Sequence, residues 1–316
     1  MNKIFGLAFF LVVLGAAAFA FSPRPLPAFP ATAVSASRVL LLGVATADRR
    51  VVAVGERGVI VVSDDEGRSW RVAKTPTEIT LTHVHFVDAR RGYAVGHDAV
   101  ILMTEDAGET WTQVHAAPAE EKPLFAVWFE NADRGIAAGA YSSPYETTDG
   151  GRRWQPMPAP EGDRHFNALA GGADGKLLLV GESGLIMRSG DAGRSWTTVE
   201  SPYKGSFFGV LRLGDASWLT FGLRGNAFRS DDDGDSWNPV TPAGAGASLM
   251  GGALLPDGGV LLVGREGVLL ESRDRGGSFT ARKTADGKTL AAAVALPSGA
   301  RVVVGEGGAA RLEAGG

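Results

Sequence analysis

The sequence predicts an all-β fold: a seven-bladed β-propeller of four-stranded blades, with the ring closed by an N-terminal strand. Three observations predict this fold. An octapeptide recurs six times at intervals of 41 to 43 residues, and a marker glycine recurs seven times at the same intervals. Each unit also contains four short apolar runs separated by turn residues. Four strands in about 42 residues, repeated along one chain, are typical of propeller blades.

The octapeptide begins with Ser or Thr, has Asp at its third and Gly at its fifth position, and closes with an aromatic residue. Its six copies are Ser63–Trp70, Thr104–Trp111, Thr147–Trp154, Ser189–Trp196, Ser230–Trp237 and Ser272–Phe279. The marker glycine precedes each closing aromatic by about 15 residues, and the seven glycines are Gly55, Gly96, Gly139, Gly181, Gly222, Gly264 and Gly305. Two independent marks with one spacing therefore define seven units.

The fourth unit shows the expected strands in order. Apolar runs cover residues 166–170, 176–181, 185–189 and 196–199. Glycine-rich turns separate the first three runs, and the octapeptide forms the hairpin between the third and the fourth. These runs are too short for helices, so we expect four strands and no helix in each unit.

The seventh unit has runs for three strands only, the last at residues 309–312. An unpaired edge strand would invite aggregation. We therefore expect residues 29–34, which precede the first inner strand at 39–44, to supply the missing outer strand. On this interpretation residues 27–316 form the propeller.

The first 20 residues are expected to direct export. Lys3 precedes an apolar run from Ile4 to Ala18, and residues 18–20 (AFA) offer a small-x-small cleavage site. The alternative is an N-terminal membrane anchor, because the run approaches the ~20 residues of a spanning helix. Residues 21–26 are expected to form an extended lead-in, since their prolines disfavour a helix. Both alternatives place the body outside the cytoplasm, in the periplasm.

Composition excludes several classes of function. The net charge is −4, with 31 basic and 35 acidic residues, so a nucleic-acid partner is not expected. The chain has no cysteine, which excludes disulfides, thiolate metal sites and cysteine nucleophiles. Its 44 glycines are about twice the usual share of about 7%, which favours many tight turns.

The octapeptide resembles the Asp-box, or bacterial neuraminidase repeat. We expect a structural role: the Asp and Ser/Thr side chains bond turn backbone, the Gly adopts a positive φ, and the aromatic packs into the sheet. Arg153 and Phe279 depart from the ideal pattern. The expected structural residues are Asp65, Gly67, Trp70, Asp106, Gly108, Trp111, Asp149, Gly151, Trp154, Asp191, Gly193, Trp196, Asp232, Gly234, Trp237, Asp274, Gly276 and Phe279.

Nearly the whole mature chain is similar to the bacterial branch of the photosystem II assembly/stability-factor-like family. The resemblance rests on residues 124–129 (LFAVWF), 94–100 (AVGHDAV), 205–209 (GSFFG) and 221–226 (FGLRGN). It implies an exported propeller without known catalytic activity. Photosynthetic members assist assembly of a membrane complex, and some other members are associated with resistance-nodulation-division exporters. The resemblance therefore implies a monomeric binding or assembly module for a membrane-associated protein, without a cofactor.

A glycosidase of the sialidase-like propeller type is the alternative, because such enzymes share the octapeptide. Sialidases open with Phe/Tyr-Arg-Ile-Pro, and the nearest match here, residues 22–25 (SPRP), lacks that element. Glycosidases also need two carboxylates roughly 5–10 Å apart beside the scissile bond. A pocket with such a pair would favour this alternative, and no catalytic residue is assigned from the sequence.

The turn after each marker glycine is expected to lie on the face opposite the octapeptides, near the channel mouth. Its residues have mixed charge, and they are either solvated turn residues and mutual ion pairs or a recognition rim for a partner. The blade-to-blade loop 201–208 adds aromatics and a cation to this face, either as a contact loop or as simple packing. The candidate partner-binding residues are Arg57, His97, Asp98, Tyr141, Glu182, Arg224, Arg265, Tyr203 and Lys204.

Two patterns raise the possibility of a metal. His83 and His85 stand two apart on an expected inner strand, so both project to one side, but no third ligand is evident. We interpret them as polar channel lining. Residues 230–236 (SDDDGDS) are acidic, but the glycine is misplaced for a calcium loop and no Glu stands at the twelfth position. No metal site is therefore assigned.

Overall fold

The computed structural model describes residues 2–20, 35–158, 162–240 and 246–313. The chain divides into two compact units, Met1–Ala33 and Val34–Gly316. Helix α1 (Asn2–Ala20) belongs to the first unit. Within the described ranges, no helix combines the length and the apolar character that crossing a membrane requires. The expected lead-in at 21–26 and the expected closing strand at 29–34 lie outside the described residues.

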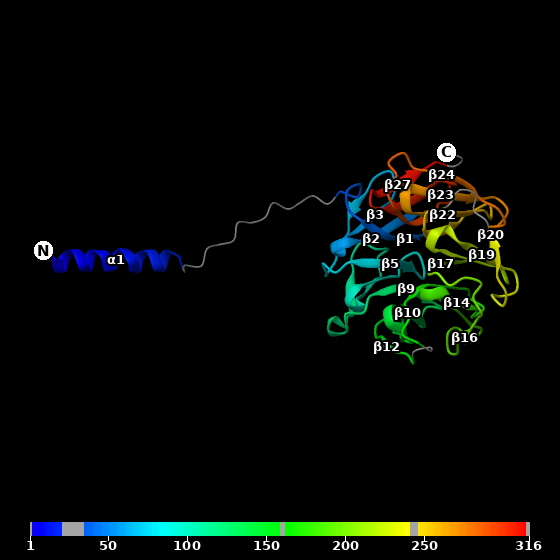
Figure 1. The fold of residues 1–316 in the computed structure, drawn as a ribbon, viewed down its shortest axis with the longest axis horizontal. Coiled ribbons are helices and arrows are strands. Elements are labelled where there is room, and N and C mark those ends of the chain that lie inside the picture. The colour runs from blue at the N-terminus through cyan, green and yellow to red at the C-terminus, as the bar shows by residue number, and fades with distance from the viewer. Residues whose placement is uncertain (1, 21–34, 159–161, 241–245, 314–316) are drawn as a thin grey trace. The chain divides into compact units, whose positions relative to one another are not determined.

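The second unit is the seven-bladed propeller that the repeats predict, with seven antiparallel sheets in chain order (Figure 1). The first four blades comprise β1 (Leu41–Ala47), β2 (Arg50–Gly55), β3 (Ile60–Ser63), β4 (Arg71–Val72), β5 (Leu81–Phe86), β6 (Gly92–Gly96), β7 (Ile101–Thr104), β8 (Thr112–His115), β9 (Leu124–Phe129), β10 (Gly135–Gly139), β11 (Tyr145–Thr147), β12 (Gln155–Pro156), β13 (Phe166–Gly171), β14 (Leu177–Gly181), β15 (Ile186–Ser189) and β16 (Thr197–Thr198). The remaining three comprise β17 (Phe207–Arg212), β18 (Trp218–Gly222), β19 (Ala227–Ser230), β20 (Asn238–Val240), β21 (Leu249–Leu254), β22 (Val260–Gly264), β23 (Val268–Ser272), β24 (Thr280–Lys283), β25 (Leu290–Ala295), β26 (Arg301–Gly305) and β27 (Gly308–Leu312).

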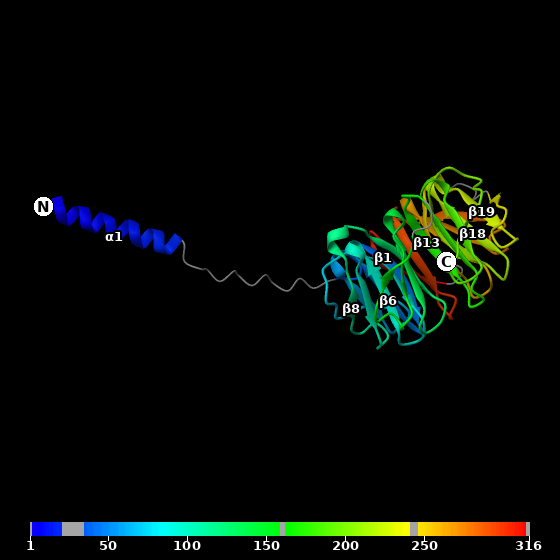
Figure 2. The ribbon, with the colours of Figure 1, turned by 90° about the horizontal axis from the view of Figure 1, so that it is seen from below.

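The ring closes between the seventh blade and the first. Each inner strand contacts the inner strand of the next blade, and β25 contacts β1. The red seventh blade accordingly lies beside the blue first blade in Figure 1, and Figure 2 shows the blades of β6 and β18 on opposite sides of the ring. Three strands of the seventh blade are described. The Ala309 N–H donates to the Ala36 carbonyl at 2.8 Å, two residues after the expected closing strand, whose position stays a prediction.

The marker glycine allows two backbones to approach closely. Gly55 has an extended φ of −168°, so a positive φ is not the reason for glycine here. A Cβ at this position would lie 2.0 Å from the Leu40 carbonyl oxygen, and the other six marker glycines show the same approach at 2.0 to 2.3 Å. The next residue, Glu56, donates its N–H to that carbonyl at 3.0 Å. In every blade the glycine therefore holds the turn after the second strand against the start of the inner strand.

The second strand of each blade is buried along nearly its whole length. Neighbouring blades cover both of its faces, so its sequence is a continuous apolar run and does not alternate. Val52, Val54 and Ile60, for example, pack against Leu81 and Ala94 of the next blade. The apolar core therefore consists of layers between the blades, repeated around the ring.

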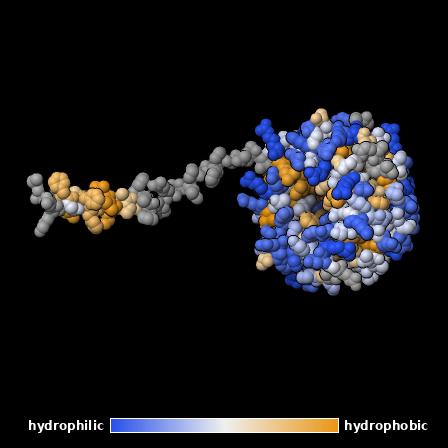
Figure 3. Space-filling model, in the orientation of Figure 1, coloured by the Kyte–Doolittle hydropathy of each residue, from blue (hydrophilic) through white to orange (hydrophobic). Residues whose placement is uncertain are grey.

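The strand order gives the ring two faces. We call the face with the octapeptide hairpins and the first-to-second strand turns the box face. We call the opposite face the turn face; it carries the blade-to-blade loops and seven short turns, which are η1 (Glu56–Gly58), η2 (His97–Ala99), η4 (Ala140–Ser142), η5 (Glu182–Gly184), η6 (Leu223–Gly225), η7 (Arg265–Gly267) and residues 306–307. Figure 3 shows one side of the molecule, mostly hydrophilic, with hydrophobic residues around a central hollow.

Candidate functional site

Each octapeptide closes a hydrogen-bonded hairpin between the third and fourth strands. In the first copy the Gly67 N–H donates to Ser63 Oγ at 2.7 Å, and Ser69 donates its N–H and hydroxyl to Asp65 at 2.8 and 2.5 Å. The indole N–H of Trp70 donates to the Gly67 carbonyl at 3.2 Å. Gly67 has a φ of 85°. The side chains are therefore used inside the turn, in the way that the pattern predicts.

These bonds keep the octapeptide carboxylates ionised. The hydroxyls of Ser69, Ser195 and Ser236 are the main cause that lowers the pKa of Asp65, Asp191 and Asp232 to about 2. A general acid for glycoside cleavage needs a raised pKa. These aspartates therefore have the electrostatics of structural acceptors.

Every octapeptide is also bonded by a side chain of the preceding blade. The fourth residue of each copy has a positive φ, and in five copies its carbonyl accepts this bond. Tyr93 Oη, for example, donates to the Gly150 carbonyl at 2.7 Å, and Arg134 donates to the Ala192 carbonyl. The remaining bonds are Arg311 to Glu66, Arg50 to Ala107, Arg229 to Arg275, and Lys176 to the Asp233 carboxylate. We call these six contacts the inter-blade clamps; the sequence analysis did not predict them.

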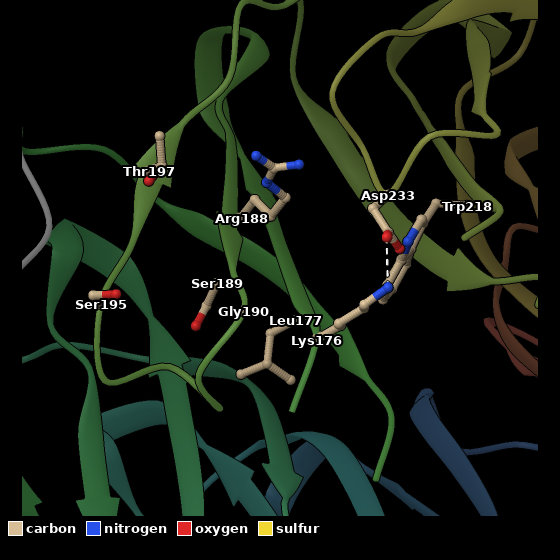
Figure 4. Close-up of a pocket in the computed structure, with 9 residues that line it drawn as sticks. All are labelled: Lys176, Leu177, Arg188, Ser189, Gly190, Ser195, Thr197, Trp218 and Asp233. Atoms are coloured by element: carbon tan, nitrogen blue, oxygen red, sulfur yellow. Dashed lines mark hydrogen bonds and ion pairs between the residues drawn. The ribbon is translucent and has the colours of Figure 1, made fainter. Parts of the chain in front are cut away.

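One clamp borders a cavity of about 240 Å³ between the fourth and fifth blades. Lys176 Nζ lies 2.5 Å from Asp233 Oδ2, beside the buried indole of Trp218 (Figure 4). Arg188 points into the same space and pairs with Asp235 at 2.5 Å. The second oxygen of Asp233 and the indole nitrogen of Trp218 are buried without a partner. Among the lining residues Asp233 is the one carboxylate, so this cavity does not contain the pair that a glycosidase needs.

The acidic run at 230–236 has partners other than a metal. Asp231 pairs with Arg229, Asp232 bonds inside its octapeptide, and Asp233 and Asp235 pair with lysine and arginine of the fourth blade. Within the part of the chain that the structure describes, no three His, Cys, Asp or Glu side chains are grouped to hold a metal ion.

On the turn face, three of the glutamates accept hydrogen bonds from backbone N–H groups. Glu56 and Glu182 accept hydrogen bonds from the N–H of Leu40 and His165, at 3.0 and 3.3 Å. Glu306 accepts one from Thr289 in the same way. Glu182, a candidate rim residue, therefore holds the start of an inner strand.

The other rim candidates differ in their solvent exposure and in their side-chain contacts. Arg57, Arg224 and Arg265 are exposed, and no ion pair or side-chain hydrogen bond engages their guanidinium groups within the described residues. Arg57 and Arg224 occupy left-handed positions, with φ of 55° and 59°. His97 and Lys204 are exposed, Asp98 is half-buried, and Tyr141 is 50% exposed with its ring 4.8 Å from that of His165. Tyr203 is half-buried against Phe207 and Phe228, so its ring packs in the core.

The channel opens into a cavity of about 470 Å³, and none of the nine rim candidates lines it. Its wall comes mainly from the first half of the seven inner strands and is mainly apolar. His83 lines this cavity, as the interpretation of polar channel lining expects. His85 does not line it, because its ring stacks on Phe129 of the next blade at 6.4 Å. The mixed-charge turns therefore surround an apolar mouth that the sequence analysis did not predict.

Comparisons with known proteins give a consistent family. A family model described as photosynthesis system II assembly factor YCF48 matches residues 63–123 and 119–250. The photosystem II assembly lipoprotein Ycf48 of Synechococcus sp. (strain CC9902) is 28% identical over 127 residues, which is 38% of each chain. The match thus spans well under half of that relative.

Solved structures share the fold at low sequence identity. A structure described as YCF48 bound to D1 peptide superposes with a TM-score of 0.68 at 19% identity, covering 86% of this chain and 92% of that one. A glycoside hydrolase of family GH74 from Niastella koreensis gives 0.67 at 12% identity, covering 87% of this chain and 52% of that one. Identities this low report architecture, which unrelated activities share.

Proposed function

Because the chain belongs to the family of the photosynthesis system II assembly factor YCF48, we propose that it is a non-catalytic binding module that holds a segment of another protein on its turn face. The relative that is described as bound to D1 peptide supports a protein partner. The match to the assembly lipoprotein supports a role in assembling a larger complex.

One observation carries the choice of the turn face. Arg57, Arg224 and Arg265 are exposed on its turns without a described partner, whereas the glutamates of neighbouring turns bond backbone. Glu266, the remaining acidic residue of these turns apart from Asp98, pairs with Lys283 at 2.7 Å. Within the described residues, the turn face therefore offers guanidinium donors that no side-chain hydrogen bond or ion pair occupies.

An arginine guanidinium suits a carboxylate on a partner. Its planar fork can make two parallel hydrogen bonds, which fix orientation as well as charge. Arg57 and Arg224 stand at the second residue of their turns, in a left-handed conformation that glycine would adopt at lower cost. We therefore assign partner recognition to these two side chains, with Arg265, His97 and Tyr141 beside them.

The proposed partner is a protein of the cell envelope. The apolar N-terminal segment supports export, and export places the propeller in the periplasm, next to membrane complexes. Exporters of the resistance-nodulation-division type, which the family resemblance implies, are the first candidates to examine. The propeller would act by holding a segment of such a complex and not by chemistry.

The test is capture of partners from a membrane extract with the tagged full-length protein. Changing both Arg57→Ala and Arg224→Ala should weaken capture at least tenfold, while the free energy of unfolding changes by no more than about 0.5 kcal/mol, as for surface substitutions. The matched control changes Arg49→Ala and Arg273→Ala, two exposed arginines of the box face. Equal capture by the wild type and the turn-face variant would refute this assignment. An equal loss of capture in the control would show that the net charge, and not these two positions, determines capture.

A further inference from the structure

The inner strand of each blade contains a β-bulge directly after its first residue. In the first blade Leu41 pairs with Gly55 and Gly43 pairs with Val54, so Leu42 is the extra residue, and the same shift occurs in all seven blades. A bulge re-aims a side chain out of the sheet alternation. The seven extra residues all line the channel cavity and form what we call the bulge ring: Leu42, Thr82, Phe125, Asn167, Phe208, Met250 and Ala291.

The two polar members of the bulge ring are already bonded to the next blade. Thr82 Oγ1 donates to the Leu124 carbonyl at 2.5 Å, and Asn167 Nδ2 donates to the Phe207 carbonyl at 2.8 Å. Each acceptor is the first residue of the neighbouring inner strand. The other five members of the bulge ring are apolar and half-buried. Four of them are large side chains, and the fifth is the alanine of the seventh blade.

The next layer of the wall is small, with one exception. In six blades the residue after the bulge is Gly or Ala, and in the second blade it is His83. The Nδ1 atom of His83 is buried and has no hydrogen-bond partner. Burial and the neighbouring His85 lower the pKa of His83 to about 4, so its imidazole is neutral at pH 7. No charged side chain is among the described residues that line this cavity.

The turns that carry Arg57 and Arg224 are bonded to the residues that precede this mouth. Glu56, the neighbour of Arg57, donates its N–H to Leu40, two residues before Leu42. Leu223, the neighbour of Arg224, donates to Ser206, two residues before Phe208. A bound segment can therefore place a carboxylate on an arginine and an adjacent side chain in the channel.

We propose that the channel cavity is a pocket for one tyrosine or tryptophan side chain of the bound partner segment. The inference rests on the proposed function. The aromatic ring would contact the apolar bulge ring, and its O–H or N–H would meet the imidazole of His83. A volume of about 470 Å³ lies within the usual range for ligand pockets, which combine apolar walls with few polar groups.

Small molecules that mimic side chains test the pocket directly. Their binding to the full-length protein is measured by NMR titration at pH 7. We expect p-cresol and 3-methylindole to bind and to shift the His83 ring signals, toluene to bind at least threefold more weakly because it lacks a donor, and n-butylammonium not to bind. Changing His83→Leu should lower p-cresol binding to the level of toluene. Absence of p-cresol binding, or equal binding of n-butylammonium, would overturn the proposal.

A filling variant provides the control on location. Ala291→Phe adds a ring at a bulge position where Phe125 and Phe208 show that the repeat accepts phenylalanine. It should reduce p-cresol binding at least tenfold, whereas Ala281→Phe, on the exposed outer strand β24, should leave it unchanged. Unchanged p-cresol binding in Ala291→Phe would overturn the assignment to the bulge ring.

Partner capture separates this inference from the proposed function. Loss of capture in Ala291→Phe but not in Ala281→Phe supports the pocket. Full capture by Ala291→Phe together with loss in the double arginine variant leaves the proposed function intact and overturns the pocket. If the wild type captures no partner, the proposed function fails. The proposal that a partner side chain occupies the pocket then fails as well, even if p-cresol binds. Self-association that Ala291→Phe abolishes would assign the cavity to a second copy and overturn the proposal.

Discussion

The box face and the turn face are built from the same seven repeats, yet they use their polar side chains differently. On the box face, serine, threonine and aspartate close each hairpin, and a side chain from the preceding blade clamps it. On the turn face, Glu56, Glu182 and Glu306 hold inner strands, while no described side chain engages the guanidinium groups of the arginines in η1, η6 and η7. The comparison teaches that repetition of a motif indicates a structural task, whereas the side chains left over between repeats are available for recognition.

The largest effect should come from an octapeptide aromatic. Trp111 is 5% exposed and packs in the first inter-blade layer. Changing Trp111→Ala should lower the free energy of unfolding by about 3–5 kcal/mol, because it opens a large cavity. Urea denaturation measures the loss, and capture per folded molecule should stay at the wild-type level. A drop in capture without a loss of stability would place recognition on the box face.

An inter-blade clamp should have the next largest effect. Arg134 is 9% exposed, bonds the Ala192 carbonyl and lies 3.4 Å from Glu130 and 3.5 Å from Glu146. Changing Arg134→Met should cost about 1–3 kcal/mol, because it leaves the Ala192 carbonyl and the Glu146 carboxylate without this donor, while Glu130 keeps its pair with Arg194 at 3.3 Å. Urea denaturation is again the measurement. The same change at exposed Arg49 is the control. An equal loss of stability there would contradict the claim that the clamps stabilise the fold more than a surface arginine does.

Acid should weaken the octapeptide hairpins. The pKa of Asp65, Asp191 and Asp232 is about 2 in the folded protein, below the ordinary 3.8. A lowered pKa stabilises the fold above the unfolded value, and this stabilisation is lost as the pH falls from about 4 toward 2. The urea midpoint should therefore fall over this window, and less steeply after Asp191→Asn. An identical slope in that variant would contradict the assignment.

The smallest effect should be a gain. In the third octapeptide Arg153 replaces the Ser or Thr whose hydroxyl donates to the aspartate in the other copies, although its N–H still bonds Asp149 at 2.9 Å. Changing Arg153→Ser should restore the missing bond and stabilise the protein by about 0.5–1 kcal/mol. Differential scanning calorimetry should show a slightly higher melting temperature. A lower value would mean that Arg153 has a role of its own.

Much of the fold could be read from the sequence because its signals are local. The marker glycine and the octapeptide act within one blade, so their spacing alone gives the strand order and the two faces. The apolar run of each second strand indicates burial on both sides. The candidate site was predicted less completely. The arginines lie on the expected turns. Glu182, a rim candidate, bonds the backbone of His165, and Tyr203 packs against Phe207, as the packing alternative for its loop expects.

By itself, then, the sequence determined seven blades, their turns and the residues at the turn tips, because each depends on neighbours along the chain. Only the tertiary structure decided which side chains form hydrogen bonds between blades. The inter-blade clamps join residues more than 45 positions apart. Glu66 and Arg311, which bond each other, meet only because the ring closes. The bulge ring has a faint local signal, since Leu41-Leu42 and Phe207-Phe208 break the alternation of a strand. That these seven residues share one mouth follows from closure, which brings the seven inner strands around a single axis.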